Sequence, residues 1–118
     1  MYSAEVLDHF ENPRGVGDLQ NATVTVERPN PVCGDVLRLS LRIADGRIVE
    51  ARFRAKGCVP AIACGSKLVE LISGQDLTAL DRITAYQISN ELGGLPQASK
   101  HAAALAAEVL KEAVKRLS

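Results

Sequence analysis

The sequence predicts an α+β fold, in which a three-stranded antiparallel sheet packs with helices and a long helix ends the chain. Two observations lead to this prediction: an apolar–polar alternation over residues 36–56, and a helical spacing of apolar residues in the second half of the chain. A chain of 118 residues has the length of one domain. The sequence contains no internal repeat, low-complexity tract or linker, so we expect residues 1–118 to form a single domain.

A hairpin over residues 36–56 is the most clearly marked element. Apolar residues occupy every second position of both halves, and the Asp45-Gly46 dipeptide between them is typical of tight hairpin turns. The predicted apolar face consists of Leu37, Leu39, Leu41, Ile43, Val49, Ala51, Phe53 and Ala55. A third strand is expected over residues 23–27, where two valines alternate with polar residues before Pro29 breaks the pattern.

A short helix is predicted over residues 3–11, with Ser3 as its N-cap. The apolar side of this helix is formed by Val6, Leu7 and Phe10. We interpret His9, between them in the sequence, as a surface or packing residue.

Helices follow the hairpin. Pro60 suits a first helical position, and apolar residues recur at helical spacing from there until Gly74. Short helices are expected over residues 77–81 and 85–92, and a long one over residues 97–117. The apolar stripe of the long helix consists of Leu105, Val109, Leu110, Val114 and Leu117.

Composition narrows the class of function. Fourteen basic and fourteen acidic residues give a formal net charge of zero, which disfavours binding to nucleic acid through its phosphates. No segment reaches the roughly 18 unbroken apolar residues of a membrane helix, and the first residues do not form a signal peptide. We therefore expect a cytoplasmic protein with no membrane partner. Three cysteines fit reduced thiols or metal ligands better than a disulfide framework.

Cys33, Gly34 and Asp35 form the first motif that could carry chemistry. In an extended chain, positions 33 and 35 project from one face about 6.5 Å apart, so a thiolate and a carboxylate could reach one metal centre. Gly34 leaves the backbone between them free to bend. A buried cysteine beside a turn-capping aspartate is the alternative interpretation, and the motif alone leaves both open.

Cys58 lies where the hairpin gives way to the helix near Pro60. The positive end of a helix dipole stabilises a thiolate, so we expect a lowered thiol pKa at this position. The start of one antiparallel strand lies beside the end of the other. Cys33 and Asp35 precede the first strand and Cys58 follows the second, so the topology brings all three residues to one end of the sheet.

Two further residues bear on this site. His101 falls in the first turns of the last helix, where an imidazole could complete a set of four ligands; a partly exposed helix-start residue is the alternative. Cys64 lies inside a helix between Ala63 and Gly65 and is interpreted as a small core residue, with an auxiliary thiol as the alternative.

The sequence resembles the family of IscU/NifU N-terminal iron–sulphur cluster scaffolds along nearly its whole length. The matching segments are Tyr2–Gly17, Pro31–Asp35 (PVCGD), Ala51–Cys58 (ARFRAKGC), Ala61–Ala63 (AIA) and Leu95–His101. The resemblance implies a scaffold, not an enzyme, that receives iron and sulphur, builds a two-iron two-sulphur cluster and passes it to client proteins. It implies cluster or zinc ligation by Cys33, Asp35, Cys58 and His101. It also implies partnership with a cysteine desulfurase and with apo iron–sulphur proteins.

The chain departs from this family pattern at two places. Family members have a cysteine directly after the histidine, where this chain has Ala102, so the resemblance implies an altered ligand set. The segment Leu95–Ser99 reads LPQAS where scaffolds served by a dedicated chaperone have LPPVK, so chaperone docking is not carried over.

Two other functions remain open at this point. In the first, zinc occupies the same four ligands, and the protein is a zinc-binding sulphur acceptor that works with a cysteine desulfurase. In the second, the chain is an interaction module without metal that kept the fold and lost the activity.

Overall fold

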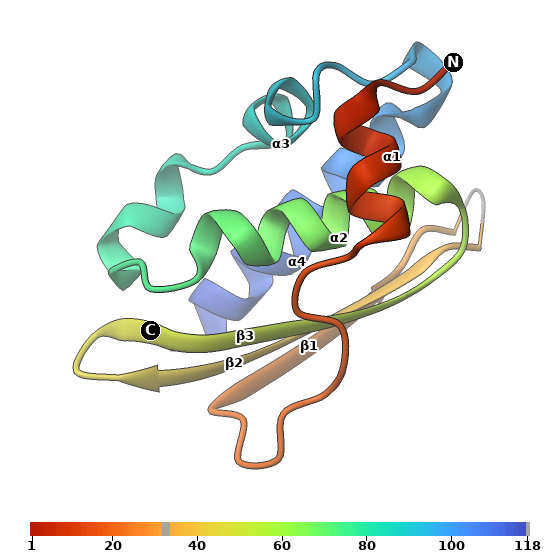
Figure 1. Cartoon of the computed structure of the whole chain (residues 1–118). Helices are drawn as coiled ribbons and strands as arrows, with labels where there is room; N and C mark the ends of the chain where they lie inside the picture. Colours follow the sequence, from red (N-terminus) through yellow and green to blue (C-terminus); the bar gives the residue numbers. More distant parts are fainter. Residues whose placement is uncertain (32–33, 118) are drawn as a thin grey trace.

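The computed structural model describes residues 1–31 and 34–117 (Figure 1). Its elements, with η for 3-10 helices, are α1 (Ala4–Glu11), β1 (Val24–Pro29), β2 (Val36–Ala44), β3 (Arg47–Lys56), α2 (Val59–Ile72), η1 (Leu77–Arg82), α3 (Ala85–Glu91), η2 (Gln97–Ser99) and α4 (Lys100–Leu117). The three strands form one antiparallel sheet in the order β1-β2-β3. The predicted α+β fold, with its hairpin, third strand and long C-terminal helix, is therefore confirmed.

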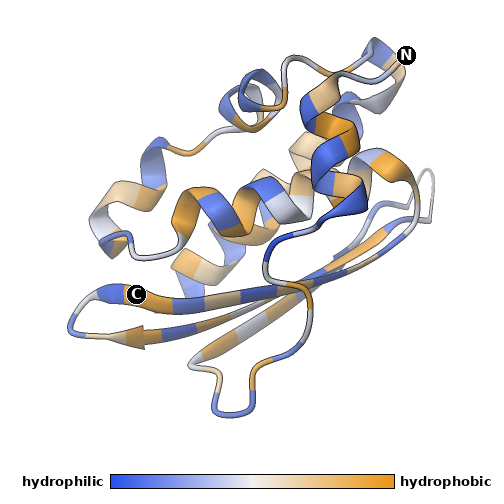
Figure 2. Cartoon of the chain, viewed as in Figure 1, coloured by the Kyte–Doolittle hydropathy of each residue, from blue (hydrophilic) through white to orange (hydrophobic). Residues whose placement is uncertain are grey.

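Helices cover one face of the sheet (Figure 1). Helix α2 packs on β3, while α4 packs on β1 and β2, and α1 lies across α2. Figure 2 shows apolar and polar residues alternating along the strands, as a sheet with one covered face requires. The largest fully buried side chains come from the sheet, α1, α2, α4 and the segments between α2 and α4: Phe53, Leu37, Leu39, Leu41, Ile48, Leu68, Ile72, Leu80, Ile88, Leu92, Leu110 and Val6.

The inward face of β3 differs from the prediction at one position. Val49 is 52% exposed, and its neighbour Ile48 is fully buried instead. The cause is a register shift next to the turn, where Ile43 pairs with Ile48 while Arg42 pairs with Glu50. Val49 is the extra residue of this irregularity, so it turns away from the core. The predicted alternation was therefore wrong only at this bulge, next to the turn.

Helix α1 buries a different face from the one predicted. Its N-cap is Ser3, as expected, with the side chain accepting a hydrogen bond from the Val6 N–H. Its buried residues are Val6 and His9, whereas Leu7 and Phe10 are 41% and 36% exposed. The expectation that Leu7 and Phe10 share the buried side was wrong, because the helix turns His9 toward α2.

His9 is a packing residue because α2 supplies a partner for its ring. Its Nδ1 lies 2.7 Å from Ser66 Oγ, which also accepts the Arg14 N–H at 2.8 Å. On the other side, Nε2 lies 3.7 Å from the Glu70 carboxylate. Burial, together with Arg14 and Lys67, lowers the pKa of His9. This contact fastens α1 and the turn that follows it to α2.

Element ends agree with the predictions to within a few residues. Helix α2 begins at Val59 with Cys58 as its N-cap, one residue before Pro60. The predicted long helix is divided into the 3-10 turn η2 and helix α4. Strand β1 continues through Pro29, because it is an edge strand and a proline there leaves no ladder bond unmade on the open side. Over the described part of the chain, no helix is both long and apolar enough to span a membrane.

Candidate metal centre

Three of the four predicted site residues meet at one end of the sheet. Asp35 directly precedes β2, Cys58 is the N-cap of α2, and His101 lies in the first turn of α4. Among the described residues, one ligand atom from each of the three lies within 4.8 Å of the others. The fourth predicted residue, Cys33, lies outside the described residues.

Asp35 is placed by the sheet and the loop before it. Its backbone carbonyl accepts the Asn30 N–H at 2.6 Å, and the Asn30 carbonyl accepts the Gly34 N–H at 2.8 Å, which closes the connection between β1 and β2. Val36 pairs with Lys56, so Asp35 comes next to Gly57 at the end of the same ladder. The residue is only 5% exposed. A carboxylate buried to this degree needs partners, and the site provides them.

Cys58 is the hydrogen-bond donor to that carboxylate. Its Sγ lies 3.2 Å from Asp35 Oδ2, so the thiol proton points at the carboxylate. Burial raises the pKa of the Cys58 thiol, and the hydrogen bond and charge of Asp35 raise it further, although the Ala61 N–H works in the opposite direction. The predicted lowering of this pKa was therefore wrong for the metal-free protein. Burial and a neighbouring carboxylate outweigh the helix N-terminus.

His101 is oriented by the backbone before α4. Its Nδ1 lies 3.0 Å from the Ala98 carbonyl oxygen, which can only accept, so Nδ1 carries the proton. The other ring nitrogen, Nε2, lies 3.5 Å from Asp35 Oδ2. Nε2 is buried and makes no hydrogen bond with any of the described residues. A backbone acceptor on the far nitrogen is the usual way in which proteins fix a metal-binding histidine.

Cys64 lies outside this cluster. It is a free thiol in α2 with no exposed surface, inside the hydrophobic core. Burial, with a smaller effect of Cys58, raises the pKa of Cys64 to about 12. A thiol in this state is inert, which agrees with its interpretation as a core residue.

Two contributors to the site were missed in the sequence. One is the Ala98 carbonyl, which could not be recognised because any residue type supplies the same backbone acceptor. The other is Gly57, where a Cβ would overlap the Asp35 carboxylate and lie 2.5 Å from its Cγ. Extending the predicted hairpin pairing by one step beyond Lys56 would have placed Gly57 opposite Asp35. That register was the signal available for finding it.

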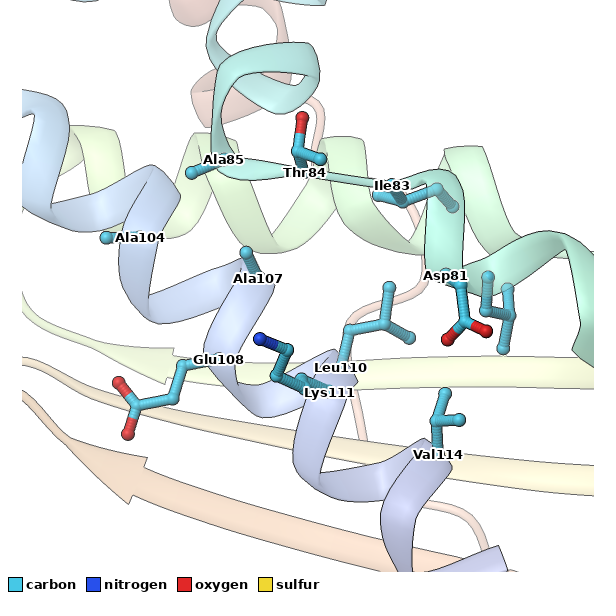
Figure 3. A pocket seen from close by; sticks show the side chains of 11 residues that line it. Asp81, Ile83, Thr84, Ala85, Ala104, Ala107, Glu108, Leu110, Lys111 and Val114 are labelled. Atoms are coloured by element: carbon cyan, nitrogen blue, oxygen red, sulfur yellow. The ribbon is translucent and has the colours of Figure 1, made fainter. Parts of the chain in front are cut away.

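A pocket of about 460 Å³ lies elsewhere, between α4 and the η1–α3 segment (Figure 3). Its lining is mainly apolar, with Leu80, Ile83, Ala107 and Leu110 among the wall residues. The described residues that line it include no cysteine or histidine. The pocket is therefore separate from the Asp35, Cys58 and His101 cluster and adds no ligand to it.

The donor set has a definite chemical character. One sulphur, one carboxylate oxygen and one imidazole nitrogen suit zinc or iron, whereas calcium and magnesium prefer oxygen donors alone. Ala102, at the position next to His101, is 2% exposed and has no donor atom. The buried Nε2 of His101, which makes no hydrogen bond among residues 1–31 and 34–117, and the buried carboxylate beside it fit a metal as a shared partner.

The fold and this donor set are those of a small metal-binding protein. The chain belongs to the NifU-like N terminal domain family, which matches residues 1–118. The iron-sulfur cluster assembly scaffold protein IscU 1 of Archaeoglobus fulgidus is 39% identical over 114 residues, which cover 97% of this chain and 74% of that protein. The scaffold protein IscU of Escherichia coli K12 is 38% identical, over 96% of this chain and 91% of its own. The crystal structure of a hypothetical protein superposes with a TM-score of 0.78 at 27% identity, covering 96% of both chains.

Proposed function

We propose that this protein is an iron–sulphur cluster assembly scaffold or carrier. It receives iron and sulphur, assembles a two-iron two-sulphur cluster and transfers that cluster to apo client proteins. The convergence of Asp35, Cys58 and His101 is the observation that supports this function most directly, with one ligand atom of each within 4.8 Å of the others. The cluster is cargo, so the protein needs ligands that hold it and also release it, and no catalytic residue is assigned.

The ligand set proposed for the cluster is Cys33, Asp35, Cys58 and His101. Cys33 enters from the sequence alone, two residues before Asp35. Iron–sulphur clusters favour thiolates, although histidine replaces cysteine in some centres. Asp35 contributes a hard oxygen, which binds such iron more weakly than a thiolate does. Because Ala102 supplies no third thiol in this region, the bound cluster should be labile, as transfer requires.

The proposed partners follow from this chemistry. Sulphur must arrive in an activated form, so we assign a cysteine desulfurase as donor and apo iron–sulphur proteins as acceptors. The LPQAS segment gives no reason to include a dedicated chaperone. The cytoplasmic setting remains a prediction made from the sequence alone.

Zinc-dependent sulphur acceptance is the second candidate function, and the mixed donor set favours it. Zinc takes sulphur, nitrogen and carboxylate oxygen at about 2.0–2.3 Å in a tetrahedron, and three donors so closely grouped can reach one ion. In this case Cys58 or Cys33 would accept sulphur from the desulfurase, and no cluster would be built.

Anaerobic reconstitution distinguishes the two functions. The purified chain is incubated with excess ferric iron and sulphide, and its absorbance and its iron, sulphide and zinc contents are measured, followed by transfer to an apo-ferredoxin. A scaffold becomes brown, holds iron and sulphide in equal amounts and activates the ferredoxin. Colourless protein that retains only zinc would contradict the scaffold function and support sulphur acceptance. An Ala102→Cys variant tests the altered ligand set, because an added thiolate should lengthen the lifetime of the cluster.

A further inference from the structure

Gly57 lies against the carboxylate of Asp35 at the end of the β2–β3 ladder. A Cβ built on Gly57 would overlap Asp35 Oδ1 and lie 2.5 Å from its Cγ and 3.1 Å from its Cβ. Non-bonded separations below about 3.0 Å are essentially never found for real Cβ atoms, so a side chain at Gly57 would force a movement. The carboxylate of Asp35 therefore occupies the space that a side chain at Gly57 would need.

This close approach determines which way the carboxylate points. One oxygen, Oδ1, lies against Gly57, and the other, Oδ2, faces Cys58 Sγ at 3.2 Å and His101 Nε2 at 3.5 Å. Asp35 is 5% exposed, so the displaced group would have to leave its buried position to relieve the overlap. Such a movement changes the position of Oδ2 relative to the other two donors.

We propose that Gly57 is a positioning residue for the metal centre, which holds the Asp35 carboxylate where it can act as a ligand. This inference rests on the proposed function of the site. A methyl group at Gly57 should weaken metal binding through Asp35 alone, while the donors of Cys58 and His101 stay in place. Gly57 itself touches no metal.

A second glycine provides a matched control for backbone strain. Gly57 has φ +147°, a conformation that L side chains adopt rarely, so any substitution there carries strain as well as a clash. Gly17 has a similar φ of +132°, but a Cβ built on it meets nothing within 4 Å. Gly17→Ala therefore introduces the strain without touching the carboxylate, and its effect is subtracted from that of Gly57→Ala.

The experiment is a double-mutant cycle read by Co²⁺ binding. Co²⁺ is titrated anaerobically into the full chain, and its affinity is taken from the sulphur-to-cobalt charge-transfer absorbance. The variants are Gly57→Ala, Gly17→Ala, Asp35→Ala and the double variant Asp35→Ala/Gly57→Ala. Loss of groups that orient metal ligands costs roughly 10–100-fold in affinity, so Gly57→Ala should bind Co²⁺ at least tenfold more weakly than Gly17→Ala. Once the carboxylate is absent, adding Gly57→Ala should change the affinity less than twofold beyond the effect of Gly17→Ala.

Two outcomes would overturn the positioning role. One is wild-type affinity in Gly57→Ala, and the other is an equal loss in both the Asp35 and the Asp35→Ala backgrounds. Thermal unfolding of the same metal-free variants gives a readout that does not depend on metal. Gly57→Ala should lower Tm more in the Asp35 background than in the Asp35→Ala background, and an additive result would show that the two residues do not compete for space.

The same design separates this inference from the function on which it rests. If the wild-type chain binds no Co²⁺, the proposed metal centre is wrong, and the unfolding cycle alone still shows whether Gly57 holds the carboxylate. If Gly57→Ala alone fails to fold while the double variant folds, the overlap with Asp35 is confirmed, because removing the carboxylate is what makes room.

Discussion

The Cys58 thiol donates a hydrogen bond to the Asp35 carboxylate, with Sγ and Oδ2 3.2 Å apart. A metal that binds both groups must first displace this proton. Because burial and Asp35 raise the pKa of Cys58, the thiol stays protonated near neutral pH in the metal-free protein. Zinc affinity should therefore increase at least tenfold per pH unit between roughly pH 6 and 8, because the Cys58 proton must be lost and any other protonated ligand adds to the slope. Competition titrations with a chromophoric chelator at several pH values measure this slope.

The pH profile of Cys58 alkylation tests the same pKa directly. In a Cys64→Ala background without metal, the rate at Cys58, followed by peptide mass analysis, should have its midpoint above the ordinary thiol pKa of about 8.5. Asp35→Asn removes the negative charge and should move the midpoint down. A midpoint at or below the ordinary value in the Asp35 protein would contradict the effect of burial.

Asp35→Ala should lengthen the lifetime of a bound cluster and slow its transfer. The carboxylate is the weakest of the proposed ligands toward soft iron, so it offers the point at which the cluster is released. Transfer to apo-ferredoxin, followed by circular dichroism, gives the rate, and we expect it to fall several-fold. A faster transfer from Asp35→Ala would show that the carboxylate mainly holds the cluster.

His101→Ala should weaken metal and cluster binding outright. No other donor is available at the following position, because Ala102 has none. We expect at least a tenfold loss of Co²⁺ affinity, since a direct ligand matters no less than the groups that orient it. Lys100→Ala is the matched control, because Lys100 is its exposed neighbour in α4 and outside the donor group. Similar losses in the two variants would indicate damage to the start of α4.

Cys64→Ala should affect stability and leave the site intact. The thiol is fully buried in the core, so its removal should lower the free energy of unfolding by about 1 kcal/mol. Denaturant unfolding measures that loss, and reconstitution should yield the wild-type cluster content. If Cys64→Ala instead assembles no cluster, Cys64 is a ligand that moves into the site during assembly.

His9 should make the fold sensitive to acid. Burial, followed by Arg14 and Lys67, lowers the pKa of His9 in the folded protein, whereas Glu70 and Asp8 act in the opposite direction. The unfolded chain then takes up a proton first as the pH falls below about 6.5, so this contribution to stability is complete above that pH and is lost below it. Unfolding free energies between pH 5 and 7.5 should fall less steeply in His9→Asn. An equal slope in both proteins would assign the effect to other groups.

The sequence was sufficient for the fold because its signals are local. Alternation and the Asp45-Gly46 turn specify the hairpin, and the hairpin alone brings Asp35 beside Cys58. The errors arose where burial depends on an irregularity in the strand pairing or on a residue far away in the sequence. Val49 was misplaced by a bulge that no residue pattern marks, and the buried face of α1 depends on Ser66, which lies 57 residues beyond His9.

The proximity of Asp35 and Cys58 was predictable from the sequence, whereas the electrostatics of the cluster were not. Asp35 and Cys58 converge as the hairpin topology predicted, and His101 lies beside them. The sign of the Cys58 pKa shift was not accessible, because it depends on how deeply the thiol and Asp35 are buried together. Gly57 was missed because its effect comes from the side chain that it lacks, whose space the Asp35 carboxylate occupies.

The three described donors all lie where elements begin, with Asp35 before β2, Cys58 before α2 and His101 in the first turn of α4. The hydrophobic core, built around residues such as Leu39 and Phe53, contains none of the three. Chemistry and folding are thus encoded by separate sets of positions. In laboratory evolution, such a chain should accept single substitutions of the ligand residues at the starts of its helices and strands. Selection for a different metal could then proceed without renewed selection for a folded protein.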